Sequence, residues 1–206
     1  MLTIWGRNNS INVQKVMWVV GELGLAHERI DAGRQYGGLN TPEFLDMNPN
    51  GLVPIIVDGD AVMWESNAIV RYLAAKYDAG GLWPKDPVVR CQADQWMDWM
   101  VTVIIPHLIP VFLGLIRTSP EERDNNAITT SANAMSENWE ILDARLSNRP
   151  FVAGDSLTIA DIPVGCAYYR YYAMDIPHPT RVNLEAWYER LQARSAFREH
   201  VMIELS

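Results

Sequence analysis

The change in sequence pattern near residue 80 is the feature that most constrains how this 206-residue chain can fold. Up to residue 78, short apolar runs alternate with helix-like segments, whereas beyond residue 86 apolar residues recur only at helical spacing. A Gly-Gly-Leu-Trp-Pro stretch between the two parts is typical of a connection. We therefore predict an α/β domain over residues 1–78, a linker over 79–85 and an all-helical domain over 86–206.

The first domain is expected to contain a small mixed sheet. Its strands are predicted at the apolar runs Leu2–Trp5, His27–Ile30, Pro54–Val57 and Ala61–Trp64. A helix that begins after Ser10 separates the first two runs, which makes a β-α-β unit with parallel strands. An Asp-Gly turn joins the last two runs as an antiparallel hairpin, and a helix follows from Ser66 to about Tyr77. A parallel crossover followed by a hairpin gives a four-stranded mixed sheet.

The second domain reads as helices alone. Pro106 and Pro110 are expected to kink or interrupt its first helix, because proline removes a backbone donor. The Thr158–Asp161 segment has the spacing of a capping box, with Asp in place of Glu. We see neither a signal-peptide pattern at the first residues nor the roughly 20 apolar residues that span a bilayer. We therefore expect a cytoplasmic protein without a membrane partner.

Charge and cysteine content exclude further classes. The chain has 17 lysine and arginine residues against 25 aspartate and glutamate residues, a net charge of −8. This balance argues against a nucleic acid or an anionic membrane as partner, since both need a basic face. Cys91 and Cys166 lie far apart and outside any Cys/His cluster, so we expect no disulfide scaffold and no metal site.

Asn8-Asn9-Ser10, where the first strand turns into the first helix, is the first segment that points to chemistry. A hydroxyl at a helix N-terminus can donate a hydrogen bond to an anion that the helix dipole already favours. The alternative is that Ser10 only caps the helix, which is the commonest use of serine there.

The second such segment runs from Asn48 to Pro54. Pro54 opens a strand that should lie inside the sheet, where proline is normally excluded. A cis peptide bond between Val53 and Pro54 would resolve this conflict and expose the Val53 N–H and C=O to an extended, peptide-like ligand. The alternative is a tight turn that binds nothing.

The third segment is Glu65-Ser66-Asn67, at the start of the next helix. The Ser66 hydroxyl and the free backbone N–H groups offer a carboxylate site, and Glu65 can pair with an amine. The alternative is an ordinary helix cap. All three segments lie at strand ends or helix starts, so we expect them to meet at one edge of the sheet.

Taken together, these segments resemble the cytosolic glutathione S-transferases, most closely the bacterial serine-type, theta-like group. The resemblance runs over essentially the whole chain and includes the Thr158–Asp161 segment with Gly154 just before it. It implies a thioredoxin-like first domain, an α-helical second domain, glutathione as cosubstrate and a homodimer.

The resemblance also implies roles for single residues. Ser10 matches the hydroxyl that stabilises the glutathione thiolate, with Asn9 as the runner-up. The backbone of Val53 matches the partner of the cysteinyl part of glutathione. Glu65 and Ser66 match the pair that holds the γ-glutamyl group.

At the glycine end of glutathione the chain departs from the family pattern. Asn50 falls near the position that often reaches the glycine, and Pro54 completes the expected glutathione site. Relatives often carry lysine where this chain has Leu52. We therefore assign the glycine carboxylate to another cation, Arg34.

The chemistry follows from the thiol. A free thiol with a pKa near 8.5 is only a few per cent thiolate at neutral pH, and a hydroxyl donor at a helix N-terminus lowers that pKa. The electrophile is expected against the helical domain. Core packing is the alternative for each residue of the expected electrophile site, which comprises Trp99, Met100, Ile104, His107 and Phe112.

Three functions are compatible with these residues. The first is conjugation of glutathione to a small hydrophobic electrophile, with displacement of halide as one variant. The second is glutathione-dependent reduction of peroxides or disulfides, suggested by Asn9 and by the lack of a cysteine at the site. The third is a non-catalytic protein that binds glutathione or a hydrophobic ligand, suggested by the Trp- and Met-rich face of the helical domain.

Overall fold

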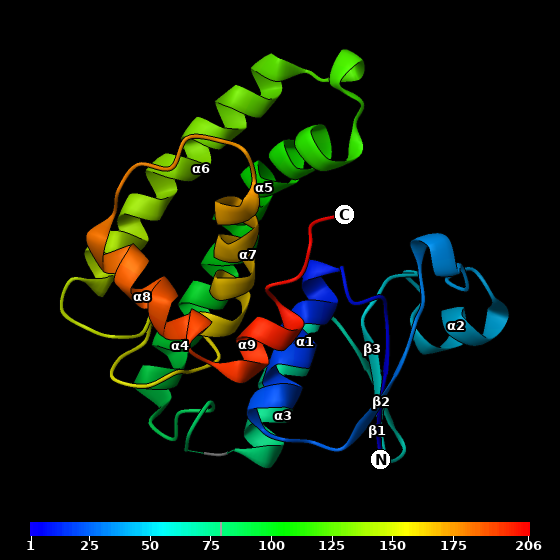
Figure 1. Cartoon of the computed structure of the whole chain (residues 1–206). Coiled ribbons are helices and arrows are strands. Elements are labelled where there is room, and N and C mark those ends of the chain that lie inside the picture. Colours follow the sequence, from blue (N-terminus) through cyan, green and yellow to red (C-terminus); the bar gives the residue numbers. More distant parts are fainter. Residues whose placement is uncertain (79) are drawn as a thin grey trace.

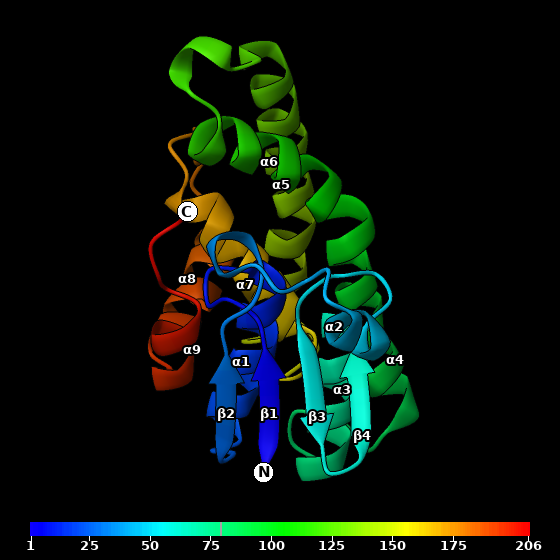
Figure 2. The ribbon, with the colours of Figure 1, turned by 90° about the vertical axis from the view of Figure 1, so that its right-hand side faces the viewer.

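The computed structural model describes residues 1–78 and 80–206. The elements of the first half are, in chain order, β1 (Leu2–Trp5), α1 (Ile11–Glu22), β2 (His27–Ile30), the 3₁₀ turn η1 (Arg34–Tyr36), α2 (Pro42–Met47), β3 (Ile55–Asp58), β4 (Ala61–Trp64) and α3 (Ser66–Tyr77). The strands form one sheet in the order β2-β1-β3-β4, which Figure 2 shows side by side. β1 is parallel to β2 and antiparallel to β3, and β3 is antiparallel to β4. The predicted four-stranded mixed sheet is confirmed.

The strand register brings three chain segments to one end of the sheet. Trp5, the last residue of β1, is paired with Ile30 on one side and with Ile55 on the other. Ile55, the first residue of β3, is in turn paired with Trp64, the last residue of β4. The loop after β1, the loop before β3 and the turn after β4 therefore leave the sheet at the same end.

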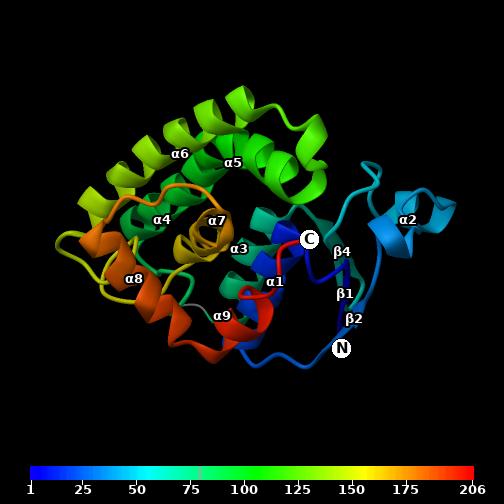
Figure 3. The same cartoon turned by 45° about the horizontal axis from the view of Figure 1, so that its top comes forward.

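Helix α1 lies at the centre of the molecule. Every residue from Val13 to Val20 is buried, which a helix on the surface of a sheet would not achieve. In Figure 1, α1 and α3 lie between the sheet and the other helices, and α2 lies on the opposite face of the sheet. Helices of the second half, α7 and α9, pack directly against α1 (Figure 3).

The second half is built from helices, as predicted. In chain order its elements are α4 (Pro87–Trp99), η2 (Met100–Ile104), α5 (Ile105–Phe112), η3 (Leu113–Arg117), η4 (Pro120–Glu122), α6 (Asn125–Leu146), α7 (Asp161–Ala173), α8 (Val182–Gln192) and α9 (Ser195–His200). Of these, η2 and η3 are π-helical turns and η4 is a 3₁₀ turn.

The first four of these elements form one continuous helical run from Pro87 to Arg117. Pro106 and Pro110 interrupt the regular α-helical hydrogen bonding, but the helical run continues past both. The π-helical turns on either side change the hydrogen-bonding pattern and so allow this. By length and composition alone, this 31-residue run could cross a membrane, contrary to our expectation from the sequence. In the fold it packs against α6 and α7, and a core helix passes the same test.

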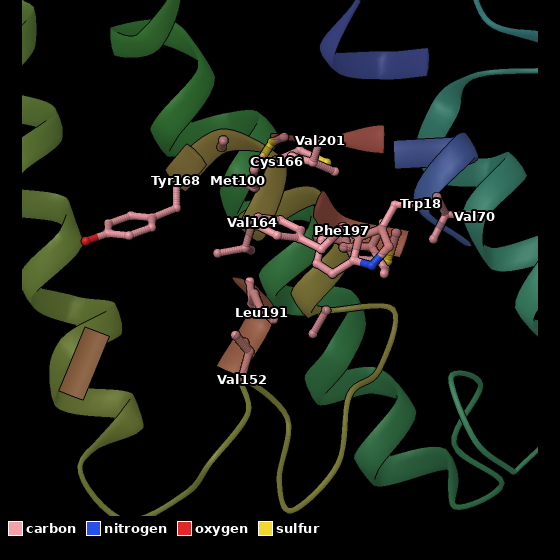
Figure 4. Close-up of a cluster of buried hydrophobic side chains, with 14 of the residues drawn as sticks. Trp18, Val70, Met100, Val152, Val164, Cys166, Tyr168, Leu191, Phe197 and Val201 are labelled. Carbon is pink, nitrogen blue, oxygen red and sulfur yellow. The ribbon is translucent and has the colours of Figure 1, made fainter. Parts of the chain in front are cut away.

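The two halves share one hydrophobic core. Trp18 of α1 lies with its ring centroid 4.6 Å from that of Phe197 in α9, and Figure 4 shows the two side by side. A Cβ atom at Gly165 of α7 would lie 2.8 Å from the Trp18 ring, so only glycine allows α7 to approach α1 this closely. The contact therefore holds the helical half firmly against the back of the sheet domain.

The predicted linker over 79–85 begins with Ala79, which lies outside the described residues. The rest of the segment is held in place. Leu82 is buried, its N–H donates to the Asp78 carboxylate at 2.7 Å, and its C=O accepts from the Ile159 N–H at 3.0 Å. This part of the connection is thus packed between the two halves.

Candidate functional site

A cavity of about 440 Å³ opens where the three segments leave the sheet. One wall is polar and comes from the loop after β1, the start of α1, the start of α3 and one arginine of α7. The facing wall is apolar and comes from the long helical run of the second half. It consists of Val101, Ile105, Leu108, Ile109, Phe112 and Leu113.

A narrower cleft of about 40 Å³ adjoins this cavity and is lined by both polar and apolar residues. The loop before β3 forms one side of it, with Asn48, Asn50, Leu52, Val53 and Pro54. The main cavity and the cleft share Asn12, Glu65 and Ser66 as a common wall. The arrangement suits a ligand that is extended and polar in the cleft and meets an apolar molecule in the main cavity.

Ser10 is the N-cap residue of α1, but its hydroxyl makes no capping hydrogen bond. The side chain is nearly buried and lines the main cavity. No acidic residue occupies the first turn of α1, so nothing there neutralises the positive end of the helix dipole. The hydroxyl is therefore free to donate to an anion in the cavity, which the capping-only alternative would not permit.

Asn9, the runner-up to Ser10, also lines the cavity. Its Nδ2 donates to Ser206 Oγ at 2.6 Å, and its C=O accepts from Arg170 Nη2 at 2.7 Å. The C-terminal tail ends beside the start of α1 (Figure 1). The Nδ2 of Asn9 thus already donates a hydrogen bond, although its Oδ1 is buried without a partner among the described residues, whereas the hydroxyl of Ser10 makes no capping hydrogen bond.

The Val53–Pro54 peptide bond is cis, as the position of the proline indicated. Among the described residues, neither the N–H nor the C=O of Val53 takes part in a hydrogen bond. Asn48 holds the loop in shape, since its Nδ2 donates to the Leu52 C=O at 2.8 Å and its Oδ1 accepts from the Asn50 N–H at 3.1 Å. The free donor and acceptor of Val53 therefore face the cleft on a fixed loop.

At the start of α3, Glu65 has a φ of 71°, a conformation that residues with a side chain rarely adopt. Strain of this kind typically costs ~1–3 kcal/mol and gathers at functional sites. Neither the Glu65 side chain nor an acid in the first turn caps α3, so the helix N-terminus is open to the cleft. Ser66 is buried, and its hydroxyl donates to Asn12 Oδ1 at 3.2 Å.

Lys15 is a functional candidate that our reading of the sequence missed. It is only 2% exposed, and its Nζ lies 3.0 Å from Asn12 Oδ1 and 3.4 Å from Ser66 Oγ. Burial lowers the pKa of Lys15 to about 8, although nearby Cys166 and Glu65 oppose the shift. The signal was a lysine in the middle of a helix whose other central residues are almost all apolar.

The structure brings only one of the expected electrophile-site residues, Phe112, to the main cavity. Met100 and Ile104 are fully buried in the core, and His107 lines neither the cavity nor the cleft. Trp99 lies in a different groove, between α4 and α6. Met100 and Ile104 are thus core residues, the alternative considered for them above. Apart from Phe112, the apolar wall is formed by other residues of the same helical run.

Arg34 does not reach the cleft either. It is exposed in η1 and lines neither cavity. Three other arginines line the main cavity instead, namely Arg7, Arg117 and Arg170. No local sequence pattern singled them out, because they come from three distant parts of the chain.

The two cysteines lie outside the site. Cys91 is exposed, and burial raises the pKa of the Cys166 thiol to about 12. Within residues 1–78 and 80–206, no group of three or more His, Cys, Asp or Glu side chains could hold a metal ion.

Comparison with known proteins agrees with this geometry. Residues 1–75 match the model of the glutathione S-transferase N-terminal domain, and residues 95–195 match that of the C-terminal domain. The chain is 43% identical to glutathione S-transferase GstB of Escherichia coli, with all of both chains covered. It is 31% identical to glutathione S-transferase 3 of Zea mays, over 97% of this chain and 93% of the relative.

A solved structure gives the same result in three dimensions. The theta class glutathione S-transferase of Xanthomonas axonopodis pv. citri, crystallised with glutathione bound, superposes with a TM-score of 0.95. It is 41% identical to this chain, and the match covers 100% of this chain and 99% of the other. The chain therefore belongs to the glutathione S-transferase family.

Proposed function

We propose that this protein conjugates glutathione to small hydrophobic electrophiles, with Ser10 stabilising the thiolate. The observation that carries the proposal is the uncapped Ser10 hydroxyl at the open N-terminus of α1, inside a cavity whose opposite wall is apolar. Glutathione would extend along the cleft, and the electrophile would lie against the apolar wall. The glutathione-bound relative from Xanthomonas supports this choice of cosubstrate.

The cleft suggests how glutathione is held. Ser66 and the first N–H groups of α3 would bind the γ-glutamyl carboxylate, and the ammonium of Lys15, 3.4 Å from Ser66 Oγ, would add a positive charge there. The Glu65 carboxylate would pair with the γ-glutamyl amine. The free N–H and C=O of Val53 suit the backbone of the cysteinyl residue. The thiol would then point out of the cleft towards Ser10.

In the reaction, the hydroxyl of Ser10 and the positive end of α1 lower the pKa of the glutathione thiol, which releases its proton to solvent. The thiolate attacks the electrophilic carbon, and a C–S bond forms. Where the electrophile carries a halogen, the carbon–halogen bond breaks and halide leaves with the electron pair. No side chain of the protein forms a covalent bond.

Replacing Ser10 by alanine tests this proposal. Loss of one hydrogen bond to an anion is worth ~1.5–3 kcal/mol, so S10A should lower kcat/KM for a neutral aryl halide by about 10- to 100-fold. The pKa of the bound thiol, followed by the ultraviolet absorbance of the thiolate, should rise by about 1–2 units. S147A, in a serine beyond the end of α6, is the matched control and should change neither quantity.

An unchanged rate and thiol pKa in S10A would assign the thiolate to another group, with N9A as the next variant. Assays with an organic peroxide and a small mixed disulfide separate conjugation from reduction. Tight binding of hydrophobic ligands without turnover of any of these substrates would instead favour a non-catalytic binding protein.

The proposal includes a cytoplasmic homodimer of two-domain subunits, with domains at 1–78 and 86–206. The family relationship and the two free thiols support it. Each subunit has a mass of 23.3 kDa, so light scattering should give about twice that value in solution.

A further inference from the structure

The main cavity has a charge opposite to that of the whole molecule. The chain carries a net charge of −8, yet four basic side chains line this cavity. Glu65 is the single acidic residue among the described residues that line it. Glu65 belongs to the common wall with the cleft, and Lys15 contacts Asn12 and Ser66 of that wall, which leaves Arg7, Arg117 and Arg170 as the other charged residues of the main cavity.

Arg170 shows that this charge is built into the fold. The residue is 4% exposed, and its Nη2 donates to the neutral Asn9 C=O and to Gln14 Oε1 at 2.7 and 3.2 Å. Its Nε is buried without a hydrogen-bond partner among the described residues, and its guanidinium lies over the Phe112 ring at 4.7 Å. A buried cation without a counterion is costly, so the fold retains here a charge that an anion would stabilise.

Arg7 and Arg117 extend the same charged end of the cavity. The Nε atoms of both are buried and unpartnered among the described residues. The Arg117 guanidinium also lies over the Phe112 ring, 4.7 Å from the ring centroid. Its Nη2 donates to the Ser206 main-chain oxygen at 2.8 Å. Neither Arg7 nor Arg170 forms an ion pair with any described residue, so these two have the greatest capacity for a ligand.

Glutathione alone does not account for these arginines. In the proposed binding mode its γ-glutamyl carboxylate lies at Ser66 and Lys15, and its glycine end lies in the narrow cleft, which contains no arginine. The thiolate brings a single negative charge to the main cavity. The remaining positive charge lies beside an apolar wall.

We propose that the electrophilic substrate is an amphipathic anion, whose apolar part packs on Phe112 and its neighbours and whose carboxylate, or an equivalent anionic group, is bound by Arg7 and Arg170. The inference rests on the proposed function and narrows its substrate class. An arginine fork matches a carboxylate in geometry, and stacking on Phe112 keeps the guanidinium of Arg170 in a fixed plane.

A matched pair of aryl halides tests the inference, 4-chloro-3-nitrobenzoate against its neutral analogue 4-chloro-3-nitrobenzamide. In both, the thiolate sulfur bonds to the ring carbon, the C–Cl bond breaks, and chloride leaves with the electron pair. Because the amide and the carboxylate differ in intrinsic reactivity, the quantity to compare is the ratio of kcat/KM for the benzoate to that for the benzamide. Each variant's ratio is divided by that of the wild type.

We expect this ratio to fall by about 10- to 100-fold in R7Q and in R170Q, the range that one charge-assisted hydrogen bond provides. R170K keeps the charge but loses the fork, so its ratio should lie between those of R170Q and the wild type. R149Q, in the loop after α6, is the control and should keep the wild-type ratio. Arg7 is less buried than Arg170, so R7Q decides the matter if R170Q does not fold.

Binding without turnover gives an independent readout. Calorimetric titration of the glutathione-saturated protein with 3-nitrobenzoate and 3-nitrobenzamide should show tighter binding of the benzoate, and R7Q should remove the difference. Equal affinities in the wild type would overturn the inference and leave the proposed function intact. The inference would also be overturned if the arginine variants lost the same rate with both aryl halides and showed a raised thiol pKa. The arginines would then stabilise the thiolate and not the electrophile. Failure to bind glutathione would instead contradict the proposed function.

Discussion

Lys15 combines burial, charge and position in a way that few residues of this chain do. Its ammonium lies within hydrogen-bonding distance of Asn12 and Ser66, at the wall that the main cavity and the cleft share. Burial lowers the pKa of Lys15 to about 8, so the ammonium predominates at neutral pH but is lost more readily than that of an exposed lysine unless an anion lies beside it. A carboxylate bound in the cleft would therefore raise the pKa of Lys15 and keep its side chain charged.

Substitution of Lys15 by glutamine should raise KM for glutathione by about 10-fold at neutral pH and leave kcat nearly unchanged, because in the proposed binding mode the lost charge lies at the γ-glutamyl end and not at the thiol. The pKa of about 8 adds a pH signature. The ammonium is present below that pH and lost above it, so the wild-type KM should rise as the pH increases through about 8.

The KM of K15Q should lack this rise. K85Q, at an exposed lysine, is the matched control and should behave like the wild type. Measuring KM for glutathione against pH at saturating electrophile checks both expectations. A K15Q enzyme with the wild-type KM at neutral pH would show that Lys15 does not contact glutathione.

Local sequence patterns predicted four candidate residues that lie within a single turn or helix cap. Ser10, Val53, Glu65 and Ser66 stand at helix starts or beside a proline, and each line at least one wall of the composite site. Arg170 carries no such local mark. Its place depends on the packing of α7 against α1, some 160 residues away in the chain, which periodicity alone does not reveal.

At the scale of elements, the long helical run of the second half departs from the constant helical period on which the predicted electrophile wall rests. A π-helical turn takes about one residue more than an α-helical turn, so the face that later residues present is rotated by about 100°. Two such turns, η2 and η3, lie in this run. Met100 and Ile104, which the helical spacing selected, face the core, whereas Ile105 and Ile109 of the same run line the cavity.

The start of α7 depends on one buried carboxylate. Asp161 is fully buried and accepts hydrogen bonds from the Val152 N–H at 3.0 Å, the Thr158 N–H at 3.0 Å and Trp187 Nε1 at 2.9 Å. Burial raises its pKa, although these hydrogen bonds oppose the shift. The capping segment predicted from the sequence thus also ties α7 to α8 and to the loop after α6.

Replacing Asp161 by alanine should lower the free energy of unfolding by about 3 kcal/mol or more, because three buried donors lose their acceptor at once. For a chain of this size, that loss corresponds to a fall in Tm of roughly 6–12 °C. Thermal or urea unfolding followed by circular dichroism measures it. D143A, at a carboxylate that accepts from the first N–H groups of α8, offers a comparison at a half-buried cap and should cost less. A D161A protein as stable as the wild type would contradict this account of the segment.

At the scale of the whole molecule, the two halves are joined by packing and by charge. Glu22 at the end of α1 receives two hydrogen bonds from the Arg194 guanidinium, at 2.7 and 2.6 Å, and one from Trp18 Nε1 at 2.8 Å. The sequence predicted two domains from the change in pattern near residue 80. It could not predict that Trp18 packs in the core of the helical half, because the 12 residues of α1 look like an ordinary sheet-covering helix.

We therefore expect the chain to unfold in one cooperative transition. Urea curves from tryptophan fluorescence and from far-ultraviolet circular dichroism should coincide, since a shared core prevents either half from unfolding alone. E22Q should shift both curves to lower urea by the same amount, equivalent to about 1–2 kcal/mol. Two separated transitions would show that each half folds independently of the other.

The common wall of Asn12, Glu65 and Ser66 lies between two parts of the site that come from different stretches of the sequence. The cleft is formed wholly by residues from the first 78 positions, whereas the apolar wall comes wholly from the helical run that follows the linker. Mutations in that run can alter which electrophile is accepted while the cleft keeps its shape. Related chains can therefore acquire new electrophilic substrates through substitutions in this one helical run, while selection for the same cosubstrate continues.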